Sequence, residues 1–251
     1  MDKQNLINYT LHLADNPLVI AQRNSEWCGH GPILEQDIAL TNIALDLIGQ
    51  ARNFYQYAAT LISENTSEDK LAFLRDNREY KNCLLVEQQN GDWAKTILKQ
   101  FFFSTYQFYL YEKLQQSSDT QIAAIAEKAI KEVTYHLRWS SEWVIRLGDG
   151  THESHRRMDD AISSLWPYTG EMFIPVAYEK EVADAGMGAD VSLIKKPWMK
   201  KVALVFNEAG LIIPLSSFMH TGGKEGKHTE HLDHLLTEMQ YMQRAYPNSE
   251  W

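Results

Sequence analysis

Apolar side chains recur at helical spacing along almost the whole chain. The clearest stripe lies in residues 33–62 and consists of Leu34, Ile38, Thr41, Leu45, Ile48 and Arg52. Positions three or four residues apart lie on the same side of an α-helix. The same spacing predicts four long helices, over residues 33–62, 68–86, 93–116 and 120–147. A helix of roughly 30 residues is about 45 Å long, which favours a helical bundle over an open α/β sheet.

Shorter helices and turns connect and extend the long helices. Residues 6–14 are periodic, and Pro17 is expected to begin a new helix, because proline is favoured in the first turn. The Asn-Gly pair at 90–91 can mark a β-hairpin, but both flanks have helical periodicity, so Asp92 is predicted as a helix N-cap. Further helices are expected over 154–173 and 197–209. The sequence therefore predicts an all-α fold, an up-down helical bundle with extra helices at both ends.

The length and composition are those of a soluble globular protein. The 251 residues are enough for one domain or two closely packed halves, and 44% of them are hydrophobic and 23% charged. We expect a single helical domain over residues 1–251, in which 220–251 form a glycine-rich loop and a C-terminal helix.

The net charge and the hydropathy of the chain limit the classes of binding partner and the cellular location that we expect. The net charge is −9 without a run of Lys or Arg, which argues against binding nucleic acid or an anionic membrane surface. No segment approaches the roughly 20 apolar residues of a membrane span, and the N-terminus lacks the pattern of a signal peptide. Cys28 and Cys83 form no metal-binding pattern and are expected to be reduced. These features predict a cytoplasmic protein.

A four-helix bundle can hold a carboxylate-bridged di-iron site, for which two helices supply a Glu each and two supply Glu-x-x-His. Part of such a ligand set is present. Asp46 interrupts an apolar run in the first long helix, Asp76 and Glu79 lie in the second, and Glu132 and His136 are one turn apart in the fourth.

The rest of the ligand set is missing. The third helix has no Asp or Glu between Asp92 and Glu112, and no histidine lies between His30 and His136. The position three residues after Glu132 is a tyrosine, so the Glu-x-x-His motif is absent there as well. We therefore expect no metal site and no catalytic residue in this chain.

Asp46, Glu132 and His136 are instead interpreted as a vestigial, structural polar network. A carboxylate within an apolar run is costly unless it is paired, so Asp46 is expected to be buried beside a Lys, an Arg or a hydroxyl. Glu132 and His136 have the spacing of an i,i+4 pair. The aromatic run FFFSTYQFYLY at 101–111 is expected to fill the core.

The C-terminal segment contains two patterns that could bind a ligand. GGKEGKHT is similar to a phosphate-binding loop, but its glycine spacing is one residue short, a His follows the Lys, and no strand precedes it. His228, His231 and His234 form HxxHxxH, and on a helix the first and last would point about 120° apart, too far for shared chelation of one metal ion. A surface helix that contacts a partner is expected here.

The segment RDNREYKN at 75–82 is locally basic through Arg75, Arg78 and Lys81. Such a segment is usually a solvated or interfacial helix face. Guanidinium and ammonium groups could alternatively contact a phosphate-bearing ligand.

Four motifs together carry a resemblance to a known family. They are WCGH at 27–30, LDLIGQARN at 45–53, LLVEQ at 84–88 and TGGKEGKHTEHL at 221–232. From end to end the chain resembles the C-subunit family of the phenylacetyl-CoA ring 1,2-epoxidases. The resemblance implies a ferritin-like fold and a non-catalytic role beside a di-iron A subunit, with which this family forms a tight heterodimer.

The resemblance also implies the other components and the reaction. A small B subunit and a reductase with FAD and an iron–sulfur centre complete the complex, which epoxidises the ring of phenylacetyl-CoA with O2 and NADPH. This chain would itself hold no cofactor. Because the segment 75–82 is compact and basic in an acidic protein, it is expected to lie near the CoA tail through Arg78, Lys81 or Asn82. Two alternatives remain open at this point: an autonomous di-iron oxidase or oxygenase, and a helical adaptor unrelated to oxygenases.

Overall fold

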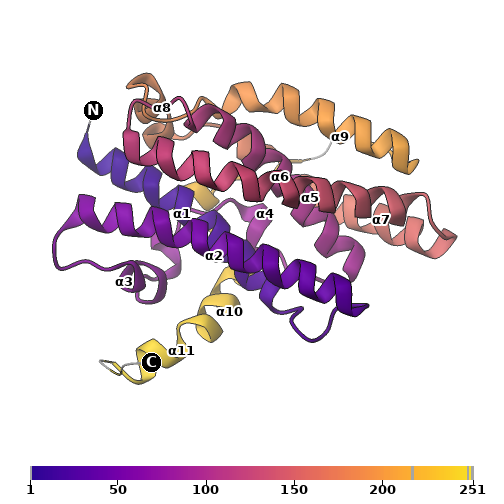
Figure 1. The fold of residues 1–251 in the computed structure, drawn as a ribbon, viewed down its shortest axis with the longest axis horizontal. Coiled ribbons are helices and arrows are strands. Elements are labelled where there is room, and N and C mark those ends of the chain that lie inside the picture. Colours follow the sequence, from indigo (N-terminus) through magenta and orange to yellow (C-terminus); the bar gives the residue numbers. More distant parts are fainter. Residues whose placement is uncertain (1, 216–217, 248, 250–251) are drawn as a thin grey trace. The chain divides into compact units, whose positions relative to one another are not determined.

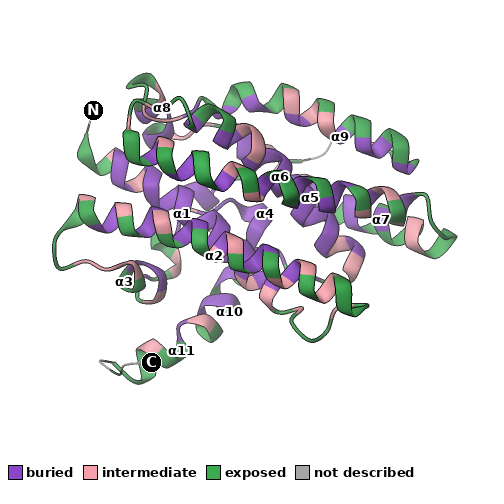
Figure 2. Ribbon diagram, viewed as in Figure 1, coloured by how far each residue is buried: buried purple, intermediate pink, exposed green. Residues whose placement is uncertain are grey.

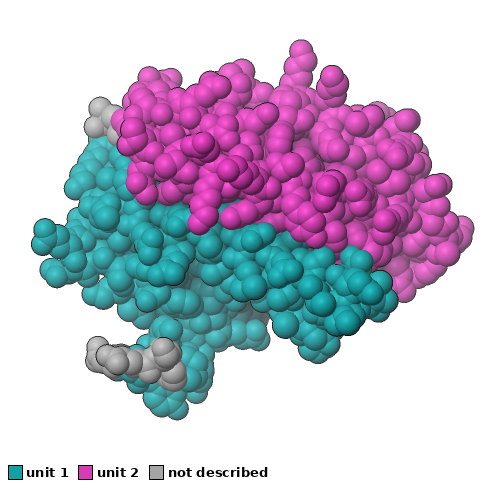
Figure 3. Space-filling model, in the orientation of Figure 1, with its two compact units in different colours: residues 1–89, 222–251 teal, residues 90–221 magenta. Residues whose placement is uncertain are grey.

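The computed structural model describes residues 2–215, 218–247 and 249. Every regular element within them is a helix, so the predicted all-α fold is confirmed. Two compact units divide the chain (Figure 3): unit 1 comprises residues 1–89 and 222–251, and unit 2 comprises residues 90–221. Each unit contains one pair of long antiparallel helices (Figure 1). Among the described residues, no helix has both the length and the apolar character needed to cross a bilayer.

The helices α1 (Lys3–Ser25) and α2 (Leu34–Ile62) form the centre of unit 1. The prediction that a new helix begins at Pro17 is wrong, because Pro17 lies inside α1. Proline removes one backbone hydrogen bond from a helix. Burial on most sides of α1 between Leu6 and Asn24 keeps it continuous despite that loss.

The two sides of α2 are both apolar, but only one is buried (Figure 2). The buried side includes Leu40, Ile43, Leu47 and Phe54. Leu34, Ile38 and Leu45, which belong to the stripe recognised in the sequence, are 71%, 51% and 59% exposed. The stripe therefore lies on the outside of the chain.

The prediction of one long helix over residues 68–86 is wrong. Three short pieces replace it: α3 (Glu68–Phe73), the 3-10 turn η1 (Asn77–Glu79) and α4 (Leu84–Glu87). The backbone is extended at Tyr80 and Cys83, between η1 and α4. The C-terminal segment supplies the remaining elements of unit 1, which are η5 (Gly223–Glu225), α10 (Glu230–Met239) and α11 (Tyr241–Ala245).

The helices α5 (Trp93–Leu114) and α6 (Thr120–Gly148) form the centre of unit 2, close to their predicted bounds. Asp92 caps α5 as predicted, because its carboxylate accepts a hydrogen bond from the Lys95 N–H at 3.0 Å. The other elements are α7 (His152–Leu165), η2 (Trp166–Tyr168), η3 (Gly170–Phe173), α8 (Ala177–Asp184), η4 (Val191–Ile194) and α9 (Lys195–Ala209).

The aromatic run of α5 fills the core of unit 2, as predicted. Phe101, Phe102 and Phe103 are all buried. The ring of Phe102 lies 5.8 Å from the Trp166 ring and 5.5 Å from the Trp198 ring, between centroids. These contacts join α5 to η2 and α9 through large apolar surfaces.

Candidate functional site

Three buried polar side chains on one face of α1 hold the extended segment that follows η1. Asp15 accepts a hydrogen bond from the Lys81 N–H at 2.7 Å, and Asn16 accepts one from the Cys83 N–H at 2.8 Å. Nδ1 of His12 donates to the Lys81 carbonyl oxygen at 2.7 Å. Because α1 satisfies these backbone groups, the segment does not need helical hydrogen bonds, and it is extended.

The same Asp15 forms a buried ion pair with Arg75. The Asp15 side chain is 0% exposed and that of Arg75 is 9% exposed, and both guanidinium amino groups reach the carboxylate. The Tyr55 hydroxyl also donates to Asp15 at 2.6 Å, and the guanidinium lies 4.2 Å from the centroid of the Tyr80 ring. Burial alone would lower the pKa of Arg75, but the charge of Asp15, the hydrogen bond with it and the nearby Tyr55 and Tyr80 together raise the pKa. Arg75 is therefore a buried, charged structural group.

A second buried carboxylate, Glu87, joins the C-terminal segment to the rest of unit 1. Glu87 accepts hydrogen bonds from Asn82 Nδ2 at 2.8 Å, from His228 Nδ1 at 2.8 Å and from the Thr229 N–H at 2.7 Å. The other ring nitrogen of His228, Nε2, lies 3.0 Å from the Tyr80 carbonyl oxygen. Both neighbours of the ring are acceptors, so the doubly protonated imidazolium is the form that satisfies both contacts.

The pKa of His228 agrees with that assignment. Burial lowers it, but the hydrogen bond with Glu87, the charge of Glu87 and the Tyr80 carbonyl together raise it above the ordinary histidine value. The side chains of His228 and Glu87 are 1% and 0% exposed. The pair is thus a buried ion pair that attaches the glycine-rich loop to α4.

The glycine-rich loop packs backbone against backbone. A Cβ atom at Gly226 would collide with the Arg78 carbonyl oxygen, and one at Gly223 would collide with the Asn82 carbonyl oxygen. Gly226 also has a φ of 80°, which glycine adopts without a steric penalty. Lys227, the lysine of the phosphate-loop pattern, is exposed, whereas the neighbouring Lys224 is buried. The glycines therefore allow close packing within unit 1.

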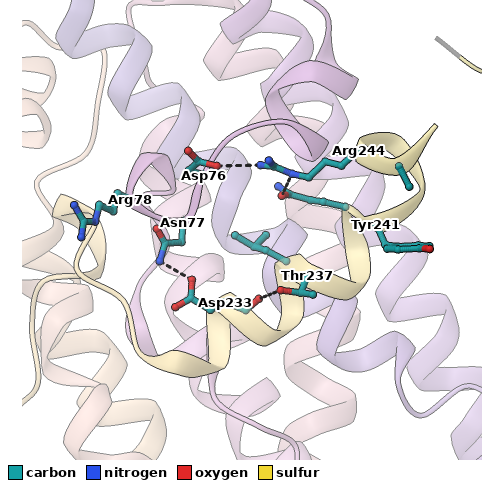
Figure 4. Close-up of a pocket in the computed structure, with 10 residues that line it drawn as sticks. Asp76, Asn77, Arg78, Asp233, Thr237, Tyr241 and Arg244 are labelled. Atoms are coloured by element: carbon teal, nitrogen blue, oxygen red, sulfur yellow. Dashed lines mark hydrogen bonds and ion pairs between the residues drawn. The ribbon is translucent and has the colours of Figure 1, made fainter. Parts of the chain in front are cut away.

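An open groove of about 810 Å³ lies between η1 and the helices α10 and α11 (Figure 4). Asn77 donates a hydrogen bond to Asp233 at 2.5 Å, and Arg244 pairs with Asp76 at 3.1 Å. The exposed guanidinium of Arg78 lies apart from the Asp76–Arg244 pair and makes no hydrogen bond or ion pair with the described residues. Arg78 is therefore the cation of this groove that is available to a ligand.

The whole chain matches one protein family. The family model described as Phenylacetic acid catabolic protein covers residues 1–251. The chain belongs to this family. The C subunit of the 1,2-phenylacetyl-CoA epoxidase of Escherichia coli (strain K12) is 49% identical over 246 residues, which cover 98% of this chain and 99% of that protein. The helical fold agrees with the ferritin-like bundle expected for phenylacetic acid catabolic proteins.

The residues predicted to lie near a CoA tail have different surroundings. Arg78 is exposed in the groove, whereas Lys81 is half-buried and Asn82 is 0% exposed. Burial lowers the pKa of the Lys81 ammonium group. Asn82 donates its amide to Glu87, so it supports the C-terminal segment. Arg75, which the sequence placed on the same basic face, is turned into the core.

The residues of the predicted polar network are divided between the units. Asp46 lies on α2 and is half-buried, although burial was expected. Glu132 is half-buried and His136 is fully buried, both on α6. Within the described residues, no group of three or more His, Cys, Asp or Glu side chains has an arrangement that could hold a metal ion.

The HxxHxxH residues have separate roles, and the expectation that all three lie on one helix is wrong. His228 precedes α10, which begins at Glu230, and its side chain is buried against Glu87. The His231 carbonyl oxygen accepts a hydrogen bond from Arg23 at 2.8 Å, and His234 is exposed.

The sequence reasoning did not identify Asp15 and Glu87, the two carboxylates around which unit 1 is organised. Both follow apolar residues, in LHLAD and LLVE. A carboxylate in an apolar run is costly unless it is paired. The apolar run around Asp46 was recognised in the sequence. The same criterion, applied to the apolar residues before Asp15 and Glu87, identifies these two carboxylates as well.

Proposed function

We propose that this chain is the C-type accessory subunit of a multicomponent 1,2-phenylacetyl-CoA epoxidase that acts in phenylacetate degradation. The observation that carries the proposal is its identity to the Escherichia coli epoxidase component over almost the full length of both proteins. In this role the chain pairs tightly with a catalytic A subunit and supports it. The chain is cytoplasmic and acts as one helical domain.

The chemistry of the complex belongs to its other components. The A subunit holds the di-iron centre, a reductase with FAD and an iron–sulfur centre delivers electrons from NADPH, and the assembly also includes a small B subunit. The residues of this chain do not fit a di-iron centre, because α5 has no carboxylate between Asp92 and Glu112. The complex is thus an O2-dependent monooxygenase, and this chain contributes structure to it.

Co-expression with the A subunit tests the proposal. We expect O2-dependent turnover of phenylacetyl-CoA only when both subunits are present with the B subunit and the reductase, and no stoichiometric iron in this chain alone. About two irons per isolated chain after anaerobic reconstitution would instead support an autonomous di-iron oxidase. Failure to co-purify with the A subunit would support an unrelated helical adaptor.

Within this proposal Arg78 contributes to binding the CoA tail, and Lys81 and Asn82 shape the backbone beside it. The exposed guanidinium of Arg78 supports this assignment. Arg78→Glu is expected to raise the KM for the CoA ester by roughly fivefold without changing kcat, equivalent to about 1 kcal/mol for an exposed charge. The matched control is Arg138→Glu, at another exposed arginine. An equal KM for the two variants would remove Arg78 from the CoA site.

A further inference from the structure

The outer side of α2 is an apolar helix face without cover in the described chain. We call Ile33, Leu34, Ile38 and Leu45, with the half-buried Thr41 and Ile48, the outer α2 face. Ile33 is 53% exposed, and Leu34, Ile38 and Leu45 are the exposed stripe described above. From position 34 to position 48 the face extends about 21 Å along the helix. That length suits contact with another helix.

The equally long helix α6 does not show such a row of exposed apolar side chains. Both helices have 29 residues. On α6 the regularly spaced apolar side chains are buried, and Tyr135 is the large hydrophobic residue that is exposed, at 38%. Soluble helices normally bury their apolar stripe and present polar residues to water. A contiguous row of exposed aliphatic side chains on a globular protein is characteristic of a surface that binds another protein.

Gly49 lies beside the outer α2 face and favours close approach by a partner. A Cβ atom built at Gly49 would meet no atom within 4 Å, so nothing in the described chain requires glycine there. Glycine in a helix interior costs about 1 kcal/mol relative to alanine. The residue is explained if the backbone of another helix packs at this point.

The charges beside the face determine which partner fits. Glu35 and Asp46 lie along one edge and Asp37 along the other, whereas Arg52 at the far end is paired with Glu68 at 3.4 Å. Two copies of this chain docked through the face would place carboxylates against carboxylates. A partner helix with aliphatic residues flanked by Lys or Arg avoids that repulsion.

We propose that the outer α2 face is the docking surface for a helix of the catalytic A subunit, which meets it with an aliphatic stripe bordered by basic residues. This inference rests on the proposed function, which supplies the identity of the occupant. The partner's aliphatic side chains cover Leu34, Ile38 and Leu45. The basic residues orient the approach through the carboxylates on the two edges.

The test is a double substitution, Ile38→Lys with Leu45→Lys. Both side chains are exposed, so the isolated variant should keep the wild-type circular dichroism spectrum and thermal midpoint. Binding to the A subunit, measured by light scattering and titration calorimetry, should weaken by at least about 100-fold, as is typical when two central interface residues are lost. The matched control is Leu204→Lys, which changes a leucine that is 62% exposed on α9. The control should bind as the wild type does.

The outcomes separate the inference from the proposed function. If the wild type binds the A subunit and the double variant binds equally well, the docking surface is elsewhere and the inference is overturned. If the wild type does not bind the A subunit at all, the proposed function fails, and the named occupant fails with it. If the double substitution instead abolishes self-association of the isolated wild-type chain, the occupant is a second copy.

The charge argument has an independent measurement. Glu35→Lys should slow association with the A subunit at low ionic strength by roughly tenfold, and the difference should shrink as salt is added. A faster association rate, or one that does not respond to salt, would contradict a basic border on the partner.

Discussion

The carboxylate of Asp15 connects three parts of unit 1 through hydrogen bonds to Tyr55, Arg75 and the backbone of Lys81. Removing one member of a buried ion pair leaves the other charge without compensation, which is the costly case for such pairs. The stability of unit 1 therefore depends on this side chain more than on any exposed ion pair.

The first prediction concerns Asp15→Asn, which keeps the shape of the side chain and removes its charge. The free energy of unfolding should fall by about 3–5 kcal/mol, because Arg75 remains buried and charged. Urea denaturation followed by circular dichroism measures this. As a control, Glu68→Gln removes the partner of Arg52, which is 65% exposed, and should cost less than about 1 kcal/mol. Similar losses in the two variants would mean that the Asp15–Arg75 pair is not the stabilising contact.

The second prediction concerns the pH dependence that His228 confers. Its pKa is raised in the folded chain above the ordinary value of 6.5. The stabilisation is therefore fully present below pH 6.5 and is lost as pH rises through the folded pKa. Glu87, Asp15 and the Tyr80 carbonyl are the groups that favour the imidazolium.

The measurement compares wild type with His228→Gln in denaturant unfolding from about pH 6 to about pH 9. The advantage of the wild type should be roughly 2 kcal/mol at the acidic end, in the range of hydrogen bonds to charged groups, and should decrease steadily towards the alkaline end. His234→Gln, at an exposed histidine, should show no such trend. An advantage that grows with pH would mean that the ring is neutral in the folded state.

At the scale of elements, the glycine-rich loop and the segment around η1 form one packed unit. The loop approaches the carbonyl oxygens of Arg78 and Asn82 so closely that a side chain cannot be inserted at Gly226 or Gly223. The motif TGGKEGKHTEHL therefore combines a steric requirement with the hydrogen-bonding requirement of its His and Thr side chains. Neither requirement is a ligand-binding property.

The third prediction follows from that packing. A left-handed backbone conformation costs a residue with a Cβ about 1–2 kcal/mol. Gly226→Ala should lower the free energy of unfolding by clearly more than this, because the added Cβ also collides with the Arg78 carbonyl oxygen. Gly29→Ala is the matched control, since Gly29 has nearly the same φ, 79°, and no neighbour within 4 Å. Thermal unfolding of the two variants separates the two contributions. Equal melting temperatures would show that the loop moves away without cost.

At the scale of the whole molecule, the chain leaves unit 1 after residue 89 and returns to it at residue 222. Unit 1 is completed only by this return, which brings Leu232, Leu235 and Leu236 into its core. The C-terminal segment is therefore a structural part of unit 1. This arrangement supports the proposal that the chain behaves as one domain.

The fourth prediction is that deleting residues 220–251 prevents recovery of soluble, cooperatively unfolding protein. The deletion exposes apolar surface of unit 1 and leaves the buried Glu87 without His228 and Thr229. A chain that ends at Ala245 keeps α10 and α11 and serves as the control. Calorimetry of the control should show a single transition. Soluble, stable protein after the longer deletion would mean that unit 1 folds without its C-terminal segment.

The long helices of unit 2 and α2 were predictable from the sequence alone, because apolar spacing and N-cap residues such as Asp92 act over a few neighbouring positions. The lack of metal-binding carboxylates in α5 was equally readable, since it depends only on which residues are present.

The path of residues 80–83 depended on tertiary contacts, because the backbone N–H groups of Lys81 and Cys83 bond to side chains on α1, and Lys81 is separated from Asp15 by 66 positions. The same holds for the role of His228, whose partner Glu87 is 141 positions away. Periodicity shows only that a helix has an apolar side. Whether that side is covered, as on α6, or exposed, as at Leu34 on α2, depends on which other elements pack against it.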